Sequence, residues 1–157
     1  MNWRVPLADL DYGREEEAAV LAVLQSRWLT MGEVTQEFEV RFAKLTNRKY
    51  AFGVSNCTVG LHLACQALGL QPGDEVIVPS LTFVATSNAA LYTGAEVCFA
   101  DIIGSDELTI DPGEIERLIK PNTKAIIVMH YAGYPCRMNE IMAIADHHKI
   151  AVIEDAA

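Results

Sequence analysis

Residues 148–157 read HKIAVIEDAA, and the fold is most clearly indicated by this stretch. An apolar run, Ile150 to Ile153, ends in two carboxylates, Glu154 and Asp155. A short apolar run of this kind is typical of a strand buried in a parallel sheet, and such sheets bind ligands beyond the carboxyl ends of their strands. A buried Asp155 needs a cationic or hydrogen-bonding partner, so the stretch predicts that something binds this carboxylate.

Upstream of this stretch, from Lys49 on, short β-rich runs alternate with amphipathic segments. This alternation predicts βαβ units and therefore an α/β fold with a mainly parallel sheet. The expected strands are YAFGV (50–54), EVIVPS (75–80), VCFAD (97–101), KAIIVMH (124–130) and IAVIED (150–155). The expected helices are TVGLHLACQALGL (58–70), TFVATSNAALYTG (82–94), DPGEIERLIK (111–120) and NEIMAIADHHK (139–149).

The first part of the chain has a different pattern and predicts two helices, Arg14–Ser26 and Glu33–Leu45, joined by RWLTMG (27–32). Phe38, Phe42 and Leu45 fall at helical spacing, which predicts that they bury one face against the α/β body. The expected organisation is one domain, in which a helical arm (1–48) precedes the α/β part (49–157).

Composition excludes several classes of partner. Twelve basic against twenty-one acidic residues give a net charge of −9, which disfavours binding to nucleic acid and to anionic membranes. Every apolar run, such as Ala125 to Met129, is far shorter than the ~20 residues that span a bilayer, and no secretory signal follows Met1. The four cysteines form no C-x-x-C pair, which predicts free thiols in a reducing cytoplasm. The adjacent His147 and His148 lack the spacing of metal ligands, so no metal site is expected.

The residues that follow the expected strands are the candidates for chemistry. Residues 55–58, Ser-Asn-Cys-Thr, begin an apolar helix, whose free N–H groups suit a phosphate, although these residues are also good N-caps. Asp155 suits a protonated pyridine nitrogen, because a carboxylate beside that nitrogen keeps the ring cationic; it is equally an ordinary acid at a strand end. Phe83 is either an aromatic platform for a ring or a core residue.

These residues carry a resemblance to a known family. The order GEVTQEFEVRFAKLTNRKYAFGVSNCTVGLHLACQALGLQPGDEVIVPSLTFVATSNAALYTGAEV, then TKAIIVMHYAGYPCRMNEIMAIADHHKIAVIEDAA, resembles the DegT/DnrJ/EryC1/StrS sugar aminotransferases. The resemblance extends from about Pro6 to Ala157. It implies pyridoxal 5'-phosphate (PLP) as cofactor and the large α/β domain of a fold-type I aminotransferase, with helices on both faces of the sheet.

The resemblance also implies roles for individual residues. Thr58, with the backbone N–H groups of Cys57 and Val59, would hold the phosphate of the cofactor. Phe83 would lie against the pyridine ring, and Asp155 would pair with the ring nitrogen and act in catalysis. The substrate side would be formed by His130, Tyr131, Trp28, Thr30 and Gly32.

The chain departs from the family pattern at two points. Cys57 stands where many members have a glycine, so we expect a turn that does not need a positive φ. The lysine that holds the cofactor as a Schiff base follows the EDAA motif in the family, and none of the lysines of this chain follows a strand in a position to replace it. These lysines are Lys44, Lys49, Lys120, Lys124 and Lys149. We therefore expect the α/β part to stop before that lysine, and the chain to be inactive alone.

The resemblance implies an aminotransferase that moves an amino group, from glutamate, to a keto-sugar nucleotide in amino-sugar biosynthesis, and a homodimer in the cytoplasm. Three alternatives stay open. The first is a PLP-dependent sugar dehydratase of the same fold, with a histidine in place of the lysine. The second is a non-catalytic regulatory member of the family, against which the joint presence of Thr58, Phe83 and Asp155 argues. The third is a flavodoxin-like nucleotide or flavin domain, which the helical arm and IEDAA disfavour.

Overall fold

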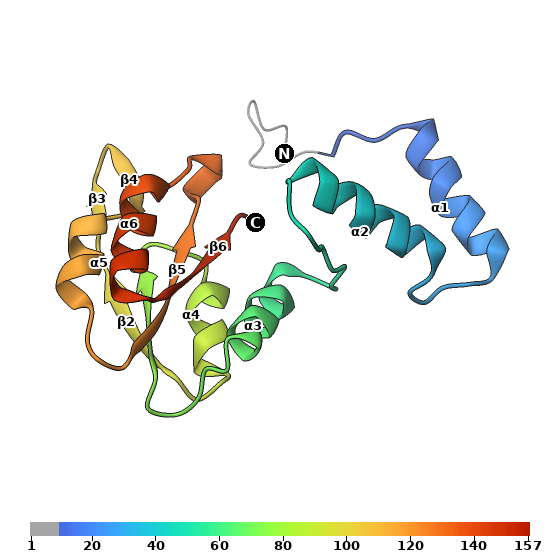
Figure 1. The fold of residues 1–157 in the computed structure, drawn as a ribbon. Helices are drawn as coiled ribbons and strands as arrows, with labels where there is room; N and C mark the ends of the chain where they lie inside the picture. Colours follow the sequence, from blue (N-terminus) through green and yellow to red (C-terminus); the bar gives the residue numbers. More distant parts are fainter. Residues whose placement is uncertain (1–9) are drawn as a thin grey trace. The chain divides into compact units, whose positions relative to one another are not determined.

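The structure, a computed structural model, describes residues 10–157 and divides into two compact units between Gly53 and Val54. The sequence predicted this boundary between residues 48 and 49. In the first unit, helices α1 (Arg14–Ser26) and α2 (Glu33–Leu45) begin and end at the predicted residues (Figure 1). The Gly13 N–H donates to the Glu16 carboxylate at 2.7 Å, which satisfies one of the free N–H groups at the start of α1.

The segment between α1 and α2 is held by Trp28. Its indole N–H donates to the carbonyl oxygen of Met31 at 3.1 Å. A Cβ on Gly32, the N-cap residue of α2, would lie 2.6 Å from the Trp28 Nε1 atom, so only glycine fits beneath this ring. The turn therefore needs both residues to keep its shape.

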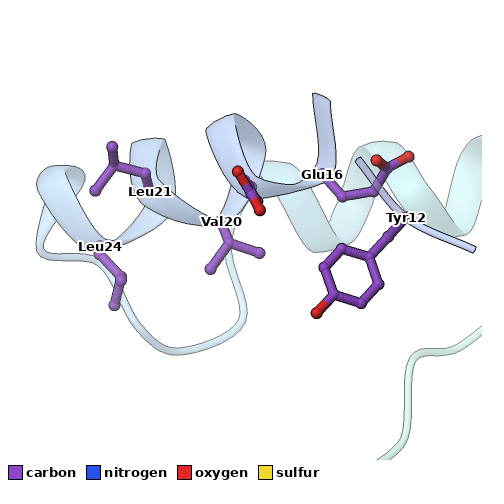
Figure 2. A pocket seen from close by; sticks show the side chains of 6 residues that line it. Tyr12, Glu16, Val20, Leu21 and Leu24 are labelled. Carbon is purple, nitrogen blue, oxygen red and sulfur yellow. The ribbon is translucent and has the colours of Figure 1, made fainter. Parts of the chain in front are cut away.

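Apolar side chains of the first unit are largely exposed. Phe38, Phe42 and Leu45 are 57%, 46% and 81% exposed, because two helices alone enclose little interior, and their burial against the α/β part stays a prediction. On α1, the side chains lie along an open, mostly apolar groove of about 480 Å³ (Figure 2). The residues that line it are Tyr12, Glu16, Glu17, Val20, Leu21 and Leu24.

The second unit contains a four-stranded sheet in the order β2-β1-β5-β6 (Figure 1). All three pairs of neighbouring strands are parallel, so the predicted α/β fold with a mainly parallel sheet is confirmed. The strands are β1 (Glu75–Pro79), β2 (Glu96–Ala100), β5 (Thr123–Met129) and β6 (Ala151–Asp155). Since parallel strands end at one edge of a sheet, residues 80, 130 and 155 come to the same edge.

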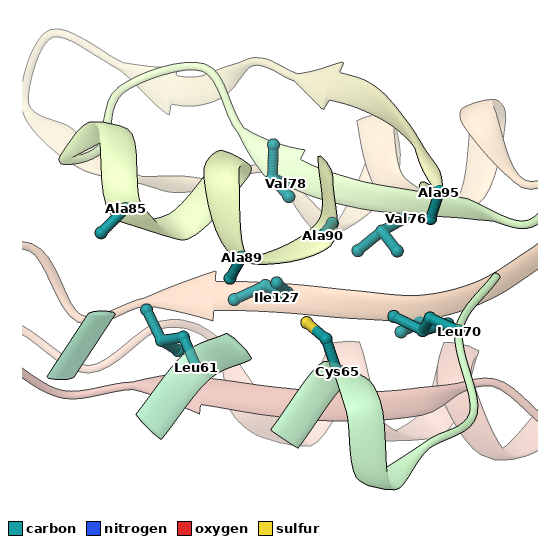
Figure 3. Packing of buried hydrophobic residues seen from close by; sticks show 11 residues of the cluster. Leu61, Cys65, Leu70, Val76, Val78, Ala85, Ala89, Ala90, Ala95 and Ile127 are labelled. Atoms are coloured by element: carbon teal, nitrogen blue, oxygen red, sulfur yellow. The ribbon is translucent and has the colours of Figure 1, made fainter. Parts of the chain in front are cut away.

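Helices cover both faces of the sheet, as expected. Alternate residues of a strand point to opposite faces, so Val76 and Val78 pack in one hydrophobic core while Ile77, between them, packs in the other. The first core contains residues of α3 (Cys57–Ala67) and α4 (Val84–Leu91), which meet Ile127 of β5 (Figure 3). The second contains residues of α5 (Pro112–Leu118) and α6 (Met138–His148).

Ile127 tests the first core. It is fully buried, so Ile127→Ala is expected to lower the free energy of unfolding by about 2–5 kcal/mol through lost contacts and a cavity. The matched change Leu63→Ala, at a side chain 52% exposed on α3, should cost less than about 1 kcal/mol. Urea denaturation followed by circular dichroism measures both. Equal losses would contradict the placement of these two residues.

Local signals in the sequence also match the structure. Asp111 caps α5 by accepting a hydrogen bond from the Gly113 N–H at 2.8 Å, with Pro112 as the first helical residue. The turn between α3 and β1 at residues 71–75, QPGDE, contains Gly73 in the left-handed region, with φ of +96°. These two signals were local, which is why sequence alone located them.

Three features differ from the prediction. YAFGV (50–54) forms no strand, and its aromatic residues Tyr50 and Phe52 are 65% and 78% exposed. The expected strand at 150–155 is β6, which is only partly buried because it is an edge strand among the residues described. An antiparallel hairpin of β3 (Ile102–Gly104) and β4 (Glu107–Ile110) follows β2 and was not predicted.

The cysteines are all free thiols, as predicted: Cys57 is exposed, Cys98 half-buried, and Cys65 and Cys136 buried. Among residues 10–157, no helix combines the length and the apolar character that crossing a bilayer requires. The thiol of Cys136 donates to the carbonyl oxygen of Met129 at 3.2 Å, which ties the loop after β5 to the end of that strand.

Candidate active site

Asp155 lies at the carboxyl end of β6 and is only 5% exposed. Three donors contact its two carboxylate oxygens. The Thr86 hydroxyl donates to Oδ2 at 2.8 Å, while the Cys57 thiol and the Ala157 N–H contact Oδ1 at 3.6 and 3.3 Å. The strong contact is therefore to Oδ2, and Oδ1 keeps the capacity to accept another donor.

Within residues 10–157, no cationic side chain forms an ion pair with Asp155. Its charge is held in a buried place by neutral donors alone, which offset only part of the cost of removing a carboxylate from water. A cation that donates a hydrogen bond to Oδ1 would remove this deficit. The site thus fits a protonated ring nitrogen.

The first turn of α3 lies beside this carboxylate, because Cys57 is both the first residue of the helix and the residue that contacts Asp155. The N-cap is Asn56, whose side chain accepts the Val59 N–H at 3.0 Å. The N–H groups of Cys57 and Thr58 precede the first bond within the helix and have no acceptor among the residues described. Together with the Thr58 hydroxyl, they are the donors that this helix end offers to an anion.

The backbone at Cys57 does not adopt the positive φ that would favour a glycine there. The turn therefore does not need glycine, as expected. Burial and then the charge of Asp155 raise the pKa of the Cys57 thiol above its ordinary value. The thiol therefore stays protonated at neutral pH and serves as a donor to Asp155.

Phe83 is the N-cap residue of α4 and is 72% exposed, so it is not a core residue of the part described. Its carbonyl oxygen accepts the N–H of Thr86, at 3.1 Å, in the first turn of the helix. Phe83 thus lies one helical turn before Thr86, the residue that contacts Asp155 directly. An exposed aromatic face in this position suits a flat ring as its ligand.

His130 is fixed at the end of β5 by bonds at both ring nitrogens. Its Nδ1 accepts the Cys136 N–H at 3.1 Å, which leaves the proton on Nε2, 3.1 Å from Glu154 Oε2. Its backbone N–H donates to the carbonyl oxygen of Asp155 at 3.1 Å. His130 therefore lies beside Asp155, and both its ring nitrogens are already bonded within the chain.

The structure brings most of the predicted site residues to one edge of the sheet. Cys57, Thr58 and Val59 come from α3, Phe83 from the start of α4, and Asp155 from β6. His130 and Tyr131 follow β5, where Tyr131 begins a short 3₁₀ turn, η1 (Tyr131–Gly133). Trp28, Thr30 and Gly32 belong to the first unit, so their part in the site stays a prediction.

Two residues of the site were missed in the sequence. They are Thr86, whose hydroxyl donates to Asp155, and Thr82, whose hydroxyl oxygen lies 2.7 Å from that of Thr86. The prediction rests on residues that directly follow strands, whereas Thr86 lies inside a helix. A threonine in the otherwise alanine-rich face of α4, three residues after Phe83, was the available indication.

The lysines of the second unit lie at the opposite edge of the sheet. Lys120 pairs with buried Glu75, the first residue of β1, at 2.6 Å. Lys124 is the second residue of β5, and Lys149 ends α6 just before β6 begins. Strands are roughly 3.3 Å long per residue, so none of these amino groups belongs to the edge where Asp155 lies.

The chain is similar in sequence and structure to one family of known proteins. The DegT/DnrJ/EryC1/StrS aminotransferase family matches residues 11–157. DesV from S. venezuelae is 38% identical, with a TM-score of 0.88 over 91% of this chain and 38% of its own. The aminotransferase from Psychrobacter cryohalolentis is 38% identical, with a TM-score of 0.86 over 92% of this chain and 37% of its own. The E. coli GDP-4-keto-6-deoxy-D-mannose-3-dehydratase, with bound hydrated PLP, is 33% identical, with a TM-score of 0.90 over 97% and 40%. The chain thus spans about two fifths of the length of these structures.

Proposed function

The chain belongs to the DegT/DnrJ/EryC1/StrS aminotransferase family, and from this membership we propose that the whole protein is a PLP-dependent sugar aminotransferase. Its substrates are an amino donor, glutamate, and a keto-sugar nucleotide in amino-sugar biosynthesis. The observation that carries the proposal is Asp155, a buried carboxylate with neutral donors and no cation among the residues described. The similar structures include aminotransferases, which supports the reaction class.

Bound PLP would supply an electron sink for the negative charge that develops on the amino donor. Asp155 would keep a proton on the ring nitrogen, because its negative charge would stabilise the cationic ring. The N–H groups of Cys57 and Thr58, with the Thr58 hydroxyl, would bind the phosphate, while the Val59 N–H is already used by Asn56. Phe83 would lie against the ring and exclude water from it.

The substrate side is assigned to His130 and Tyr131 after β5 and to Trp28, Thr30 and Gly32 of the first unit. His130 orients its neighbours rather than reacting itself. Its Nε2–H donates to Glu154, and its Nδ1 accepts the Cys136 N–H. We propose that none of the lysines of the second unit anchors the cofactor, because they lie at the edge of the sheet opposite Asp155. We also propose a homodimer with active sites at the subunit boundary, and the cytoplasm as its compartment, which the free thiols support.

The dehydratase alternative has its own support, since the E. coli dehydratase is 33% identical and overlaps 97% of this chain. Asp155, Thr58 and Phe83 would serve the same cofactor in both reactions, so they do not separate them. The two enzymes differ in the anchoring position, lysine in the aminotransferase and histidine in the dehydratase.

The reaction itself is tested by incubating the whole protein with PLP, glutamate and a keto-sugar nucleotide. We expect a product in which the sugar carbonyl has become an amino group, identified by mass spectrometry, with 2-oxoglutarate formed in equal amount. A sugar that has lost a hydroxyl group and carries no nitrogen would identify the dehydratase instead. A colourless protein that neither binds PLP nor converts the sugar would favour the regulatory alternative.

Thr58 is expected to contribute to cofactor affinity rather than to chemistry. A hydrogen bond to a charged group is worth about 1.5–3 kcal/mol, so Thr58→Ala should weaken PLP binding by roughly ten- to a hundredfold. Excess PLP should largely restore turnover.

Equilibrium binding of PLP to the whole protein measures this effect. Thr93→Ala is the matched control, because Thr93 lies beyond the far end of α4 and its hydroxyl bonds the carbonyl oxygen of Ala90. Unchanged affinity in Thr58→Ala would remove Thr58 from the phosphate site.

A further inference from the structure

Behind Asp155 lies a chain of two hydroxyl groups on α4 and the turn before it. Thr86 is fully buried, and its Oγ1 lies 2.8 Å from Asp155 Oδ2 and 2.7 Å from Thr82 Oγ1. Thr82 precedes α4 and Thr86 is its third residue, so one helical turn carries both groups. The chain of contacts therefore runs from Thr82 through Thr86 to the carboxylate.

The hydrogen bonds in this chain have one direction when Asp155 is ionised. A carboxylate only accepts, so the single hydroxyl proton of Thr86 goes to Asp155. Thr86 Oγ1 is then an acceptor toward Thr82, whose proton completes the chain. Hydrogen bonds in series strengthen one another, so Thr82 makes Thr86 a better donor to the carboxylate.

The hydroxyl of Thr86 differs from its neighbours on the same helix. Ser87 donates to the carbonyl oxygen of Val84 at 3.0 Å, and Thr93, beyond the helix end, donates to that of Ala90 at 2.7 Å. Such bonds to the preceding turn are what helical hydroxyl groups commonly form. Thr86 instead directs its proton across to β6, at a residue 69 positions away in the sequence.

We propose that Thr86, supported by Thr82, is a positioning residue that holds Oδ2 of Asp155, so that Oδ1 is presented to the ring nitrogen of PLP. The inference rests on the proposed function and adds residues to it. Oδ1 receives only the long contacts from the Cys57 thiol and the Ala157 N–H, so it is the oxygen with capacity for a strong, charge-assisted bond. Without the Thr86 donor, the orientation of the carboxylate toward the ring nitrogen is less well maintained.

The direct test is the protonation of the ring nitrogen, read by its ¹⁵N chemical shift in the whole protein loaded with ¹⁵N-labelled PLP. Thr86→Val keeps the shape of the side chain and removes the hydroxyl group. We expect its ¹⁵N signal to move toward the unprotonated ring at fixed pH and its PLP affinity to fall about tenfold, the size of one hydrogen bond to a charge. Thr86→Ser, which retains the hydroxyl, should restore both quantities.

Two further variants complete the test. Thr82→Val should move the ¹⁵N signal in the same direction by a smaller amount, and it replaces Thr86→Val if that variant does not fold. Thr109→Val is the matched control, because Thr109 is also buried but lies in β4, and its hydroxyl donates to Glu107 rather than to Asp155. Its signal should equal that of the wild type.

The outcomes separate this inference from the proposed function. If the wild type binds PLP with a protonated ring nitrogen and both Val variants leave the signal unchanged, the positioning role is wrong and the function stands. The same holds if Thr86→Ser behaves like Thr86→Val, since packing would then explain the effect. If the wild type binds no PLP, the proposed function and the inference fail together.

Discussion

Asp155→Asn in the whole protein is expected to lower the rate of transamination by at least about a hundredfold, the usual loss when a preorganised electrostatic group is removed. The amide has nearly the shape of the carboxylate and still accepts the Thr86 proton at its oxygen. It carries no charge, however, so it no longer stabilises a proton on the ring nitrogen. The ring then withdraws electrons less strongly, and the amino donor reacts slowly.

The controls for Asp155→Asn separate chemistry from folding. Asp106→Asn makes the same change at an exposed carboxylate in the β3–β4 turn and should leave the rate unaltered. The unfolding temperature of Asp155→Asn should stay close to that of the wild type, because a buried charge without a cation is replaced by a neutral group. Turnover of Asp155→Asn at the wild-type rate would show that this carboxylate has no role in the reaction.

The central strands and most helices could be predicted because their signals are local. In β1, Val76 to Val78 form an uninterrupted apolar run with a sharp polar boundary, as do Ala125 to Met129 in β5, since helices cover both faces there. Asp111 and Pro112 define the start of α5 by their own chemistry. Asp155 could be identified for a related reason: a carboxylate directly after an apolar strand is unusual enough to demand a partner.

The features that sequence missed depend on contacts between distant segments. Residues 50–54 have a high β propensity, but no partner strand pairs with them among the residues described, and propensity alone does not form a strand. Thr86 is chemically an ordinary helical threonine, and its role appears only when β6 brings Asp155 to within 2.8 Å. The tautomer of His130 also depends on a contact that the local sequence does not show. The N–H of Cys136 donates to Nδ1 of His130, so the ring proton lies on Nε2.

The 157 residues by themselves are expected to form no 2-oxoglutarate from glutamate above the rate of free PLP. Transamination needs an amine at the cofactor to exchange and move protons. Lys120, Lys124 and Lys149 lie near the amino ends of β1, β5 and β6, at the opposite edge from Asp155. Lys44 lies within α2, and the Lys49 ammonium lies 5.0 Å from the centre of the Tyr50 ring.

The same reasoning separates binding from turnover in this chain. The donors at the start of α3, Phe83 and Asp155 are all present, so the chain should still bind PLP, with the affinity reduced by loss of the covalent anchor. Spectrophotometric titration with PLP measures binding, and coupled detection of 2-oxoglutarate measures turnover, with the whole protein as the positive control. Steady 2-oxoglutarate formation would show that a lysine within residues 1–157 reaches the cofactor, and Lys→Ala variants at the five positions would identify it. If the chain binds PLP but forms no 2-oxoglutarate, the amino group of the anchoring lysine is the one group that it lacks. Every other group assigned to the cofactor already lies at the carboxyl edge of the sheet.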